Sequence, residues 1–136
     1  MIKKLLIFAL LVLPVIRPAA EEPWKLRLSS PSEKINLVLD LYEESIEVPN
    51  MEMFGPMNGY MNGNIYGVWT VTSFRIVDDH TAKVNFSNDL GSETQKTSIV
   101  QTGDSTWIMK FEGGNVVKRV NGKKLVKIPG EIVFTK

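Results

Sequence analysis

Short runs in which apolar and polar residues alternate, separated by turn signals, fill most of this sequence and constrain its fold more than any other feature. The run TAKVNFS places Ala82, Val84 and Phe86 on one face and Lys83 and Asn85 on the other. A side-chain period of two residues is the pattern of a β-strand with one buried face. The sequence therefore predicts a sheet whose strands each bury one side.

Similar runs recur along the chain. They read WKLRLSS, KINLVLDLYE, IYGVWTVTSFRIV, ETQKTSIVQ, TWIMKFE, VVKRV, KKLVKI and EIVFTK, and SIEV is expected to add a short strand. Asn121-Gly122 lies between two of these runs and predicts a type I′ hairpin turn, because both residues tolerate positive φ. We expect eight to ten strands in one all-β domain, folded as a small antiparallel β-barrel or barrel-like sandwich.

The first twenty residues have the features of a secretory signal peptide. Lys3 and Lys4 precede an apolar run, and Ala19-Ala20 offers a cleavage point. The apolar run is shorter than the roughly 18 residues that a transmembrane helix needs. We therefore expect a cleaved signal peptide at residues 1–20 and one folded domain at residues 21–136. The mature protein is expected to be periplasmic or secreted, with no transmembrane span.

The chain contains no cysteine, so neither a disulfide framework nor a lipid anchor on cysteine is available. The expected mature domain folds on its hydrophobic core alone, and its 116 residues are enough for one such core. It carries 13 basic and 15 acidic residues, a balance that indicates no nucleic-acid partner. Because small secreted animal domains usually rely on disulfides, this composition favours a bacterial exported protein.

The segment MEMFGPMNGYMNGN holds four of the six methionines, with glycines between them at a four-residue period. These methionines are Met51, Met53, Met57 and Met61. No segment outside residues 50–61 has the length or period for a helix, and a proline inside this one would interrupt a long helix. We expect a short Met/Gly-rich helical turn or a loop there.

Three interpretations of this segment remain open. Methionine fills irregular gaps in cores, and glycine lets a backbone approach a sheet closely, so packing across one end of a barrel is the favoured one. An adaptable lid over an apolar ligand is the second. The third is a periplasmic copper site, because the thioethers of Met51, Met53, Met57 and Met61 are soft ligands suited to Cu(I). Under the first two interpretations no cofactor is expected.

The longest alternating run contains Gly67-Val68-Trp69. A Gly-x-Trp at the start of a barrel strand resembles the signature of the lipocalin and wider calycin superfamily, which small exported bacterial proteins often share. The resemblance covers residues 65–136 and implies a lipocalin-like barrel with one end closed by Trp69 and an interior that holds a small hydrophobic ligand. Side chains expected to line or cap that cavity are Met53, Met57, Tyr60, Met61, Tyr66, Trp69 and Trp107.

Candidate catalytic groups do not form a recognisable set. The single histidine, His80, lies in the turn DDHT, and no Gly-x-Ser-x-Gly motif accompanies it. The acidic stretch with Asp40 and Glu43 is interpreted as a solvated face rather than a catalytic carboxylate pair. NDLGSE lacks the ligand spacing of a calcium loop and is expected to be a hairpin turn. An enzyme is therefore not expected.

Five basic residues surround the Asn121-Gly122 turn, namely Lys118, Arg119, Lys123, Lys124 and Lys127. Such a knob suits anions, polysaccharide or anionic lipid headgroups, although a solvated hairpin whose lysines prevent edge pairing is the favoured interpretation.

We expect a non-enzymatic, exported β-barrel binding module. Its partner is expected to be a small apolar ligand or a protein of the cell envelope. A Cu(I)-binding protein and an interaction or inhibitor module of the envelope are the alternatives.

Overall fold

Ten strands form in residues 22–136, the part of the chain that this computed structural model describes. They are β1 (Lys25–Ser30), β2 (Ile35–Asp40), β3 (Gly59–Gly63), β4 (Trp69–Ile76), β5 (Thr81–Asn88), β6 (Thr94–Gln101), β7 (Thr106–Glu112), β8 (Lys118–Asn121), β9 (Lys124–Lys127) and β10 (Glu131–Thr135). Helical structure within this part of the chain amounts to one 3₁₀ turn, Glu52–Phe54. The predicted all-β class is confirmed, and so is the short helical turn in the Met/Gly segment.

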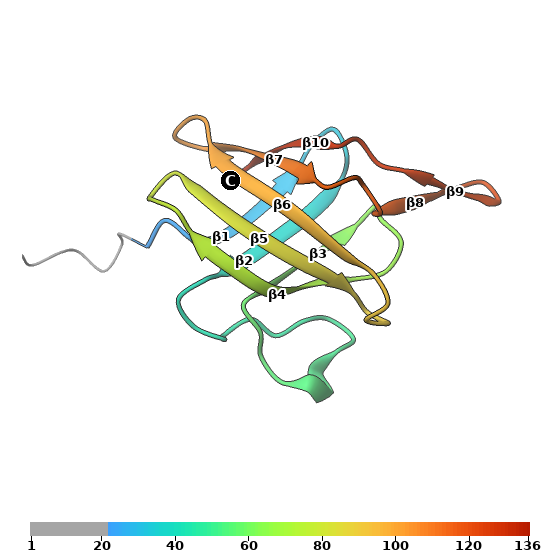
Figure 1. Ribbon diagram of the computed structural model, residues 1–136, viewed down its shortest axis with the longest axis horizontal. Helices are drawn as coiled ribbons and strands as arrows, with labels where there is room; N and C mark the ends of the chain where they lie inside the picture. Colours follow the sequence, from blue (N-terminus) through green and yellow to red (C-terminus); the bar gives the residue numbers. More distant parts are fainter. Residues whose placement is uncertain (1–21) are drawn as a thin grey trace, which may run out of the picture.

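Eight of the strands close an antiparallel barrel in chain order (Figure 1). Each strand from β1 to β7 pairs with the next, and β10 pairs with β7. The barrel closes where β10 meets β1 at Ser29 and Thr135. β8 and β9 form a separate hairpin that extends away from the barrel between β7 and β10. This up-and-down order needs only short connections, because strands that follow one another in sequence lie side by side.

Side chains fill the interior of the barrel. The predicted alternation is observed on β5, where Ala82, Val84 and Phe86 are fully buried. The other strands contribute further buried residues to the same core, including Leu26, Leu28, Ile35, Leu37, Leu39, Met61, Trp69, Ile99, Trp107, Met109, Ile132 and Phe134. Burying one large apolar side chain stabilises a fold by roughly 1.5–3 kcal/mol. Those side chains with no accessible surface, such as Phe86 and Met109, are in contact with other side chains rather than with a ligand-sized space.

The barrel wall is held by few backbone pairs between β3 and β4, as it is where β10 meets β1. Strands β3 and β4 share two register pairs, and a β-bulge follows between Val71 and Ser73. Beyond the bulge, Phe74 and Ile76 lie opposite interior residues of β5 but remain 38% and 37% exposed. Bulges increase the local twist of a strand, which explains why β4 separates from β3 here.

The β8–β9 turn lies one residue later than predicted. Asn121 pairs with Lys124, so Gly122 and Lys123 are its central residues. Gly122 has φ 67° whereas Lys123 does not adopt positive φ, which is the pattern of a type II′ turn rather than type I′. The Asn-Gly signal located the hairpin correctly, but the prediction of a type I′ turn was wrong.

Two predicted strands are shorter than their alternating runs. The run IYGVWTVTSFRIV becomes β4 only at Trp69, because Gly67 turns the chain with φ 82°. SIEV contributes a single bridge between Ile46 and Met57. The predicted signal peptide lies outside the described residues, and within residues 22–136 no helix is long and apolar enough to span a bilayer.

Candidate functional site

A groove opens at the end of the barrel from which the β8–β9 hairpin extends. It lies between the turn before β4, the β5–β6 turn and the hairpin, and its volume is about 160 Å³. The lining residues are Tyr66, Trp69, Asn88, Asp89, Leu90, Ser92, Glu93, Val116, Lys118 and Leu125. Two of the predicted ligand-binding residues, Tyr66 and Trp69, therefore lie together in this groove.

The Gly67-x-Trp69 motif builds the first wall. Trp69 is 2% exposed, and its ring packs in the core while its indole N–H donates to the Tyr66 carbonyl at 3.3 Å. Gly67 has φ 82°, and a Cβ at this position would lie 3.3 Å from the Asp89 carboxylate. Positive φ is accessible to glycine at little cost. The motif thus directs the Trp69 side chain inward and leaves the Tyr66 side chain at the groove.

The β5–β6 turn builds the second wall. Asn88 organises it, because its side-chain oxygen accepts hydrogen bonds from the N–H groups of Ser92 and Glu93 at 2.9 and 3.2 Å. Its amide nitrogen donates to the Ser92 hydroxyl at 3.1 Å. Side chains of this type replace backbone partners in tight turns. Leu90, at the tip of the turn, is left 83% exposed beside the groove.

Buried Gln95 positions the third wall. Its side-chain nitrogen donates to the carbonyls of Glu112 and Gly114 at 3.2 and 2.8 Å, and its side-chain oxygen accepts the Val116 N–H at 2.9 Å. Gln95 is 2% exposed, so these bonds satisfy an amide that water does not reach. They attach the segment before β8 to the barrel and place Val116 at the groove.

Both apolar and charged side chains line the groove. Tyr66, Leu90 and Leu125 are 60%, 83% and 49% exposed. The carboxylates of Asp89 and Glu93 lie on the side of the β5–β6 turn, and Lys118 belongs to the hairpin. Apolar surface gathered around a hollow, with a few polar groups beside it, is typical of a binding site.

The methionines do not form a helical stripe. Met53 lies in the 3₁₀ turn and is 85% exposed, whereas Met61 lies in β3 and is fully buried in the core. Met51 and Met57 are half-buried, and Met57 forms the bridge with Ile46. The four thioethers are not gathered at one place in this structure. Cu(I) binding by all four stays a prediction that requires the segment to rearrange.

The predicted ligand-binding residues divide among several places. Tyr66 and Trp69 lie at the groove, whereas Trp107 is buried where β7 begins, near the opposite end of the barrel. Tyr60 is half-buried on β3 and alternates with the interior residue Met61, so it faces outward. The structure therefore brings two of the seven residues together.

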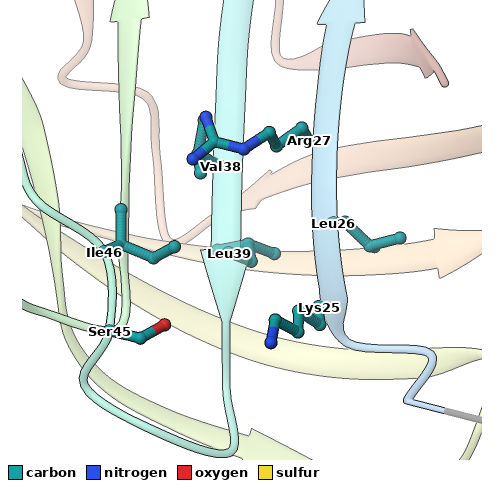
Figure 2. A pocket seen from close by; sticks show the side chains of 7 residues that line it. All are labelled: Lys25, Leu26, Arg27, Val38, Leu39, Ser45 and Ile46. Carbon is teal, nitrogen blue, oxygen red and sulfur yellow. The ribbon is translucent and has the colours of Figure 1, made fainter. Parts of the chain in front are cut away.

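A wider hollow lies outside β1 and β2, beside the chain that follows β2 (Figure 2). Leu26 and Leu39 also line this hollow, although both belong to the hydrophobic core. Val38 and Ile46 form its apolar part, but they are only 5% and 8% exposed. Because little apolar surface is available to a ligand, this hollow is a weaker candidate than the groove.

Asp40 lies at the end of β2 near that hollow. Burial raises the pKa of Asp40, but the Ser45 hydroxyl and the N–H groups of Tyr42 and Glu43 donate to its carboxylate and lower the pKa below its usual range. Asp40 is 1% exposed, so the interpretation of this residue as part of a solvated face was wrong. Its side-chain hydrogen bonds are all to the neighbouring turn, and Lys25 of β1 lies 4.0 Å from it, which indicates a structural role.

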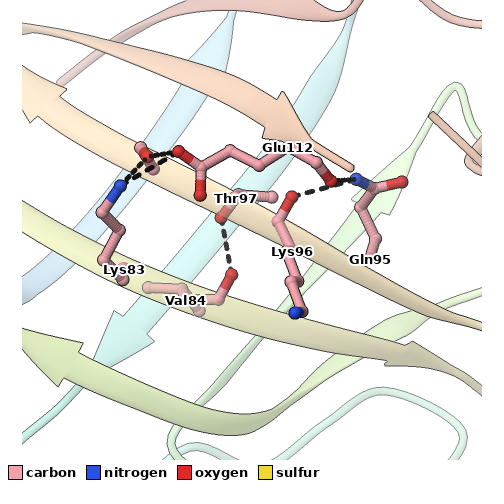
Figure 3. A network of polar contacts seen from close by, with 7 residues as sticks. Lys83, Val84, Gln95, Lys96, Thr97 and Glu112 are labelled. Atoms are coloured by element: carbon pink, nitrogen blue, oxygen red, sulfur yellow. Dashed lines mark hydrogen bonds and ion pairs between the residues drawn. The ribbon is translucent and has the colours of Figure 1, made fainter. Parts of the chain in front are cut away.

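Glu112 belongs to a polar network on the outer face of the barrel (Figure 3). The Ser98 hydroxyl and the Lys83 ammonium donate to one Glu112 carboxylate oxygen at 2.5 and 3.0 Å, and they hold the pKa of Glu112 below its usual range. Lys83 also donates to Ser98 at 2.8 Å. The network joins β5, β6 and β7, as cross-strand pairs commonly do.

His80 is exposed, and its Nδ1 lies 3.2 Å from the Gln101 side-chain oxygen. Within residues 22–136, no group of three or more histidine, aspartate or glutamate side chains is placed to hold a metal ion.

Comparisons with protein-family models, with curated proteins and with solved structures gave no match to this chain. What the protein has in common with lipocalin-like proteins is the general architecture, a closed antiparallel barrel of eight strands. The Gly-x-Trp motif opens the fourth of these strands.

Sequence reasoning missed three apolar residues of the groove. Leu90 carried a usable signal, because a large apolar residue at the tip of an otherwise polar turn has no core to enter. Val116 and Leu125 carried none, because their position depends on how the β8–β9 hairpin attaches to the barrel.

Proposed function

We propose that this protein is an exported, non-enzymatic binding module that holds a small apolar group in the groove beside Trp69. The observation that carries the proposal is the convergence of Tyr66, Leu90 and Leu125, which come from three separate segments and are all exposed. Covering such surface is favourable by roughly 25 cal/mol per Å² of apolar area. Export rests on the pattern of residues 1–20.

The packed interior supports a site outside the barrel. Side chains such as Leu37, Phe86 and Met109 have no accessible surface, so an apolar ligand finds its contact area at the barrel end instead. This proposal keeps the small apolar ligand or envelope partner expected from the sequence and moves its place of binding.

The size of the groove suggests which group it holds. Its volume of about 160 Å³ is close to that of an engineered protein cavity, roughly 150 Å³, that binds benzene. One aromatic ring, or an aliphatic group of similar size, fits this volume. Such a group belongs either to a free small molecule or to a side chain of an envelope protein.

The polar side chains of the groove support binding rather than catalysis. Asn88 and Ser92 bond to each other within the β5–β6 turn. Asp89, Glu93 and Lys118 supply charge of both signs around the apolar walls. Charges placed beside an apolar contact orient a ligand and give specificity.

Titration with indole, followed by amide chemical shifts in ¹⁵N-labelled residues 22–136, tests the groove. We expect the shifts to cluster around Tyr66, Leu90 and Leu125. The double variant Tyr66→Ser/Leu90→Ser removes two apolar walls and should weaken indole binding by about tenfold or more, which corresponds to roughly 1.4 kcal/mol. Both side chains are largely exposed, so the variant is expected to fold.

A matched control changes one aromatic and one aliphatic residue elsewhere on the surface. Phe54→Ser/Val133→Ser replaces side chains that are 65% and 46% exposed, and it should leave the indole affinity unchanged. Equal loss in both double variants, or no shifts at the groove, would sink the proposal.

Native mass spectrometry of the protein purified after export separates the two sources of the apolar group. An added organic mass identifies a free ligand. A bare mass, together with indole binding at the groove, assigns the group to a side chain of a protein partner.

A further inference from the structure

The β8–β9 hairpin concentrates positive charge. Five of the ten residues from 118 to 127 are basic and none is acidic. The rest of residues 21–136 contains eight basic and fifteen acidic residues. The protein therefore carries a cationic element on an anionic body, and Figure 1 shows this element extending away from the barrel.

The hairpin is attached to the barrel at its base. Arg119 pairs with Glu33 of the β1–β2 turn at 2.9 Å, and the Tyr66 N–H donates to the Lys118 carbonyl at 2.7 Å. The side chains of Arg119 and Glu33 are 20% and 21% exposed. A two-stranded hairpin is only marginally stable by itself, so these contacts fix its direction relative to the barrel.

The two faces of the hairpin differ. Residues two apart on a strand share a face, and the register pairs Val120 with Leu125 and Lys118 with Lys127. These four residues lie on one face, where Val120 and Leu125 are 57% and 49% exposed. The other face carries Arg119 and its ion pair with the barrel. The first face is therefore apolar near the tip and cationic near the base, with two more lysines at the turn, and its Lys118 and Leu125 border the groove.

We propose that the β8–β9 hairpin docks the protein on the surface of an anionic phospholipid bilayer. Val120 and Leu125 enter the interfacial region, and Lys118, Lys123, Lys124 and Lys127 contact the lipid phosphates. Protection of a strand edge accounts for the lysines. It does not account for an apolar cross-strand pair held in solvent beside them. Apolar contact combined with basic side chains is the usual chemistry of peripheral membrane binding.

Charge decides the orientation of docking. The lysines are attracted to the anionic surface, whereas the body of the barrel is repelled by it. Long lysine side chains also reach phosphates while their methylene groups lie along apolar surface. The groove is at the same end of the barrel, so docking places it next to the bilayer.

Co-sedimentation with vesicles tests this inference in residues 22–136, which contain the whole closed barrel and its core. Vesicles of equal parts phosphatidylglycerol and phosphatidylcholine should bind the protein, and vesicles of phosphatidylcholine alone should bind it far less. Binding should also be lost at about 1 M salt, where the Debye length is about 3 Å.

Two hairpin variants separate the electrostatic and apolar contributions. Each lysine near an anionic surface contributes a factor of roughly five to binding, so Lys123→Gln/Lys124→Gln/Lys127→Gln should weaken partitioning on the order of a hundredfold. Val120→Ser should weaken it several-fold without changing the net charge. All four side chains are exposed, and none lines the groove, so indole binding should persist in both variants.

The control variant Lys96→Gln/Lys110→Gln/Lys136→Gln removes three exposed lysines from the barrel body. It has the same net charge as the triple hairpin variant. It should nevertheless bind anionic vesicles far better than that variant, because it keeps the lysines of the hairpin. Equal weakening in both triple variants overturns the inference, as does equal binding to the two kinds of vesicle. Binding to poly-glutamate without binding to anionic vesicles also overturns it and assigns the hairpin to an acidic protein partner.

Discussion

Asp40 shows how one buried charge shapes the chain around it. Its carboxylate accepts N–H groups from Tyr42 and Glu43 at 3.0 and 3.1 Å and the Ser45 hydroxyl at 2.5 Å. Lys25 lies 4.0 Å away. These bonds end β2 and turn the chain into the segment that crosses the outer side of the sheet. A buried carboxylate is tolerated only because its oxygen atoms are satisfied in this way.

Asp40→Asn should lower the free energy of unfolding by roughly 2 kcal/mol at neutral pH, because hydrogen bonds to a charged group contribute about 1.5–3 kcal/mol. The pKa of Asp40 is lowered from 3.8, so the folded protein binds fewer protons here than the unfolded chain. The stabilisation is therefore complete well above pH 3.8 and is lost as the pH falls through the lowered value.

Urea unfolding of both proteins between neutral and acidic pH measures this difference. The difference in the free energy of unfolding between wild type and Asp40→Asn should become smaller as the pH falls. Glu43→Gln, which changes an exposed side chain of the same turn, should have little effect at any pH. If that difference stays constant across the pH range, the stabilising role of ionised Asp40 is contradicted.

Strand β3 shows why the Met/Gly segment contains regularly spaced glycines. A Cβ at Gly59 would lie 2.2 Å from the Val38 carbonyl oxygen, and one at Gly63 would lie 2.6 Å from the Lys34 carbonyl oxygen. Both contacts are to main-chain atoms of the neighbouring strand or its turn, which cannot swing away. Gly59 and Gly63 therefore let β3 approach β2 closely within the barrel wall, whereas the packing interpretation placed the segment across one end of the barrel. Gly55 has no such neighbour within 4 Å.

Gly59→Ala should lower the free energy of unfolding by about 3 kcal/mol, because the new methyl group forces β3 away from β2. Gly130→Ala is the matched control, since Gly130 has open space around it and does not adopt positive φ. Thermal or urea unfolding of both variants measures the effect. Equal stability of the two variants would show that β3 does not lie against β2 as closely as described.

The whole molecule depends on closing the sheet with β10. This strand pairs fully with β7 and meets β1 at Ser29 and Thr135. It contributes Ile132 and Phe134 to the core and presents Val133 to solvent. Closure removes the exposed strand edges that an open sheet of this length would present to other chains.

Phe134→Ala should lower the free energy of unfolding by roughly 3–5 kcal/mol, because a fully buried aromatic ring leaves a cavity in the core. Val133→Ala, one residue earlier and 46% exposed, should change it by less than about 0.5 kcal/mol. Calorimetry of the two variants checks the contrast. Similar losses for both would contradict the inward and outward assignment on β10.

The structure agrees with the family resemblance in its general architecture only. The predicted antiparallel barrel is observed, but the predicted lining residues Met61 and Trp107 are part of a packed core. Two of the predicted ligand-binding residues, Tyr66 and Trp69, line the groove. Periodicity in a strand says that a side chain is buried, and it does not say whether the space opposite holds another side chain or a ligand.

The sequence by itself determined nine of the ten strands, because alternation is a local property that each strand carries within its own residues. It missed β3 (Gly59–Gly63), where the expectation of a helical turn or loop as far as residue 61 was wrong. It placed Ala82, Val84 and Phe86 inside and located the β8–β9 hairpin within one residue of its turn. Tertiary structure alone decided which strand ends meet. The groove unites Tyr66, Leu90 and Leu125 from segments far apart in the chain, and Arg119 needs Glu33, 86 positions earlier, to fix the direction of the hairpin. Contacts of that kind depend on how the sheet closes, which no local pattern records.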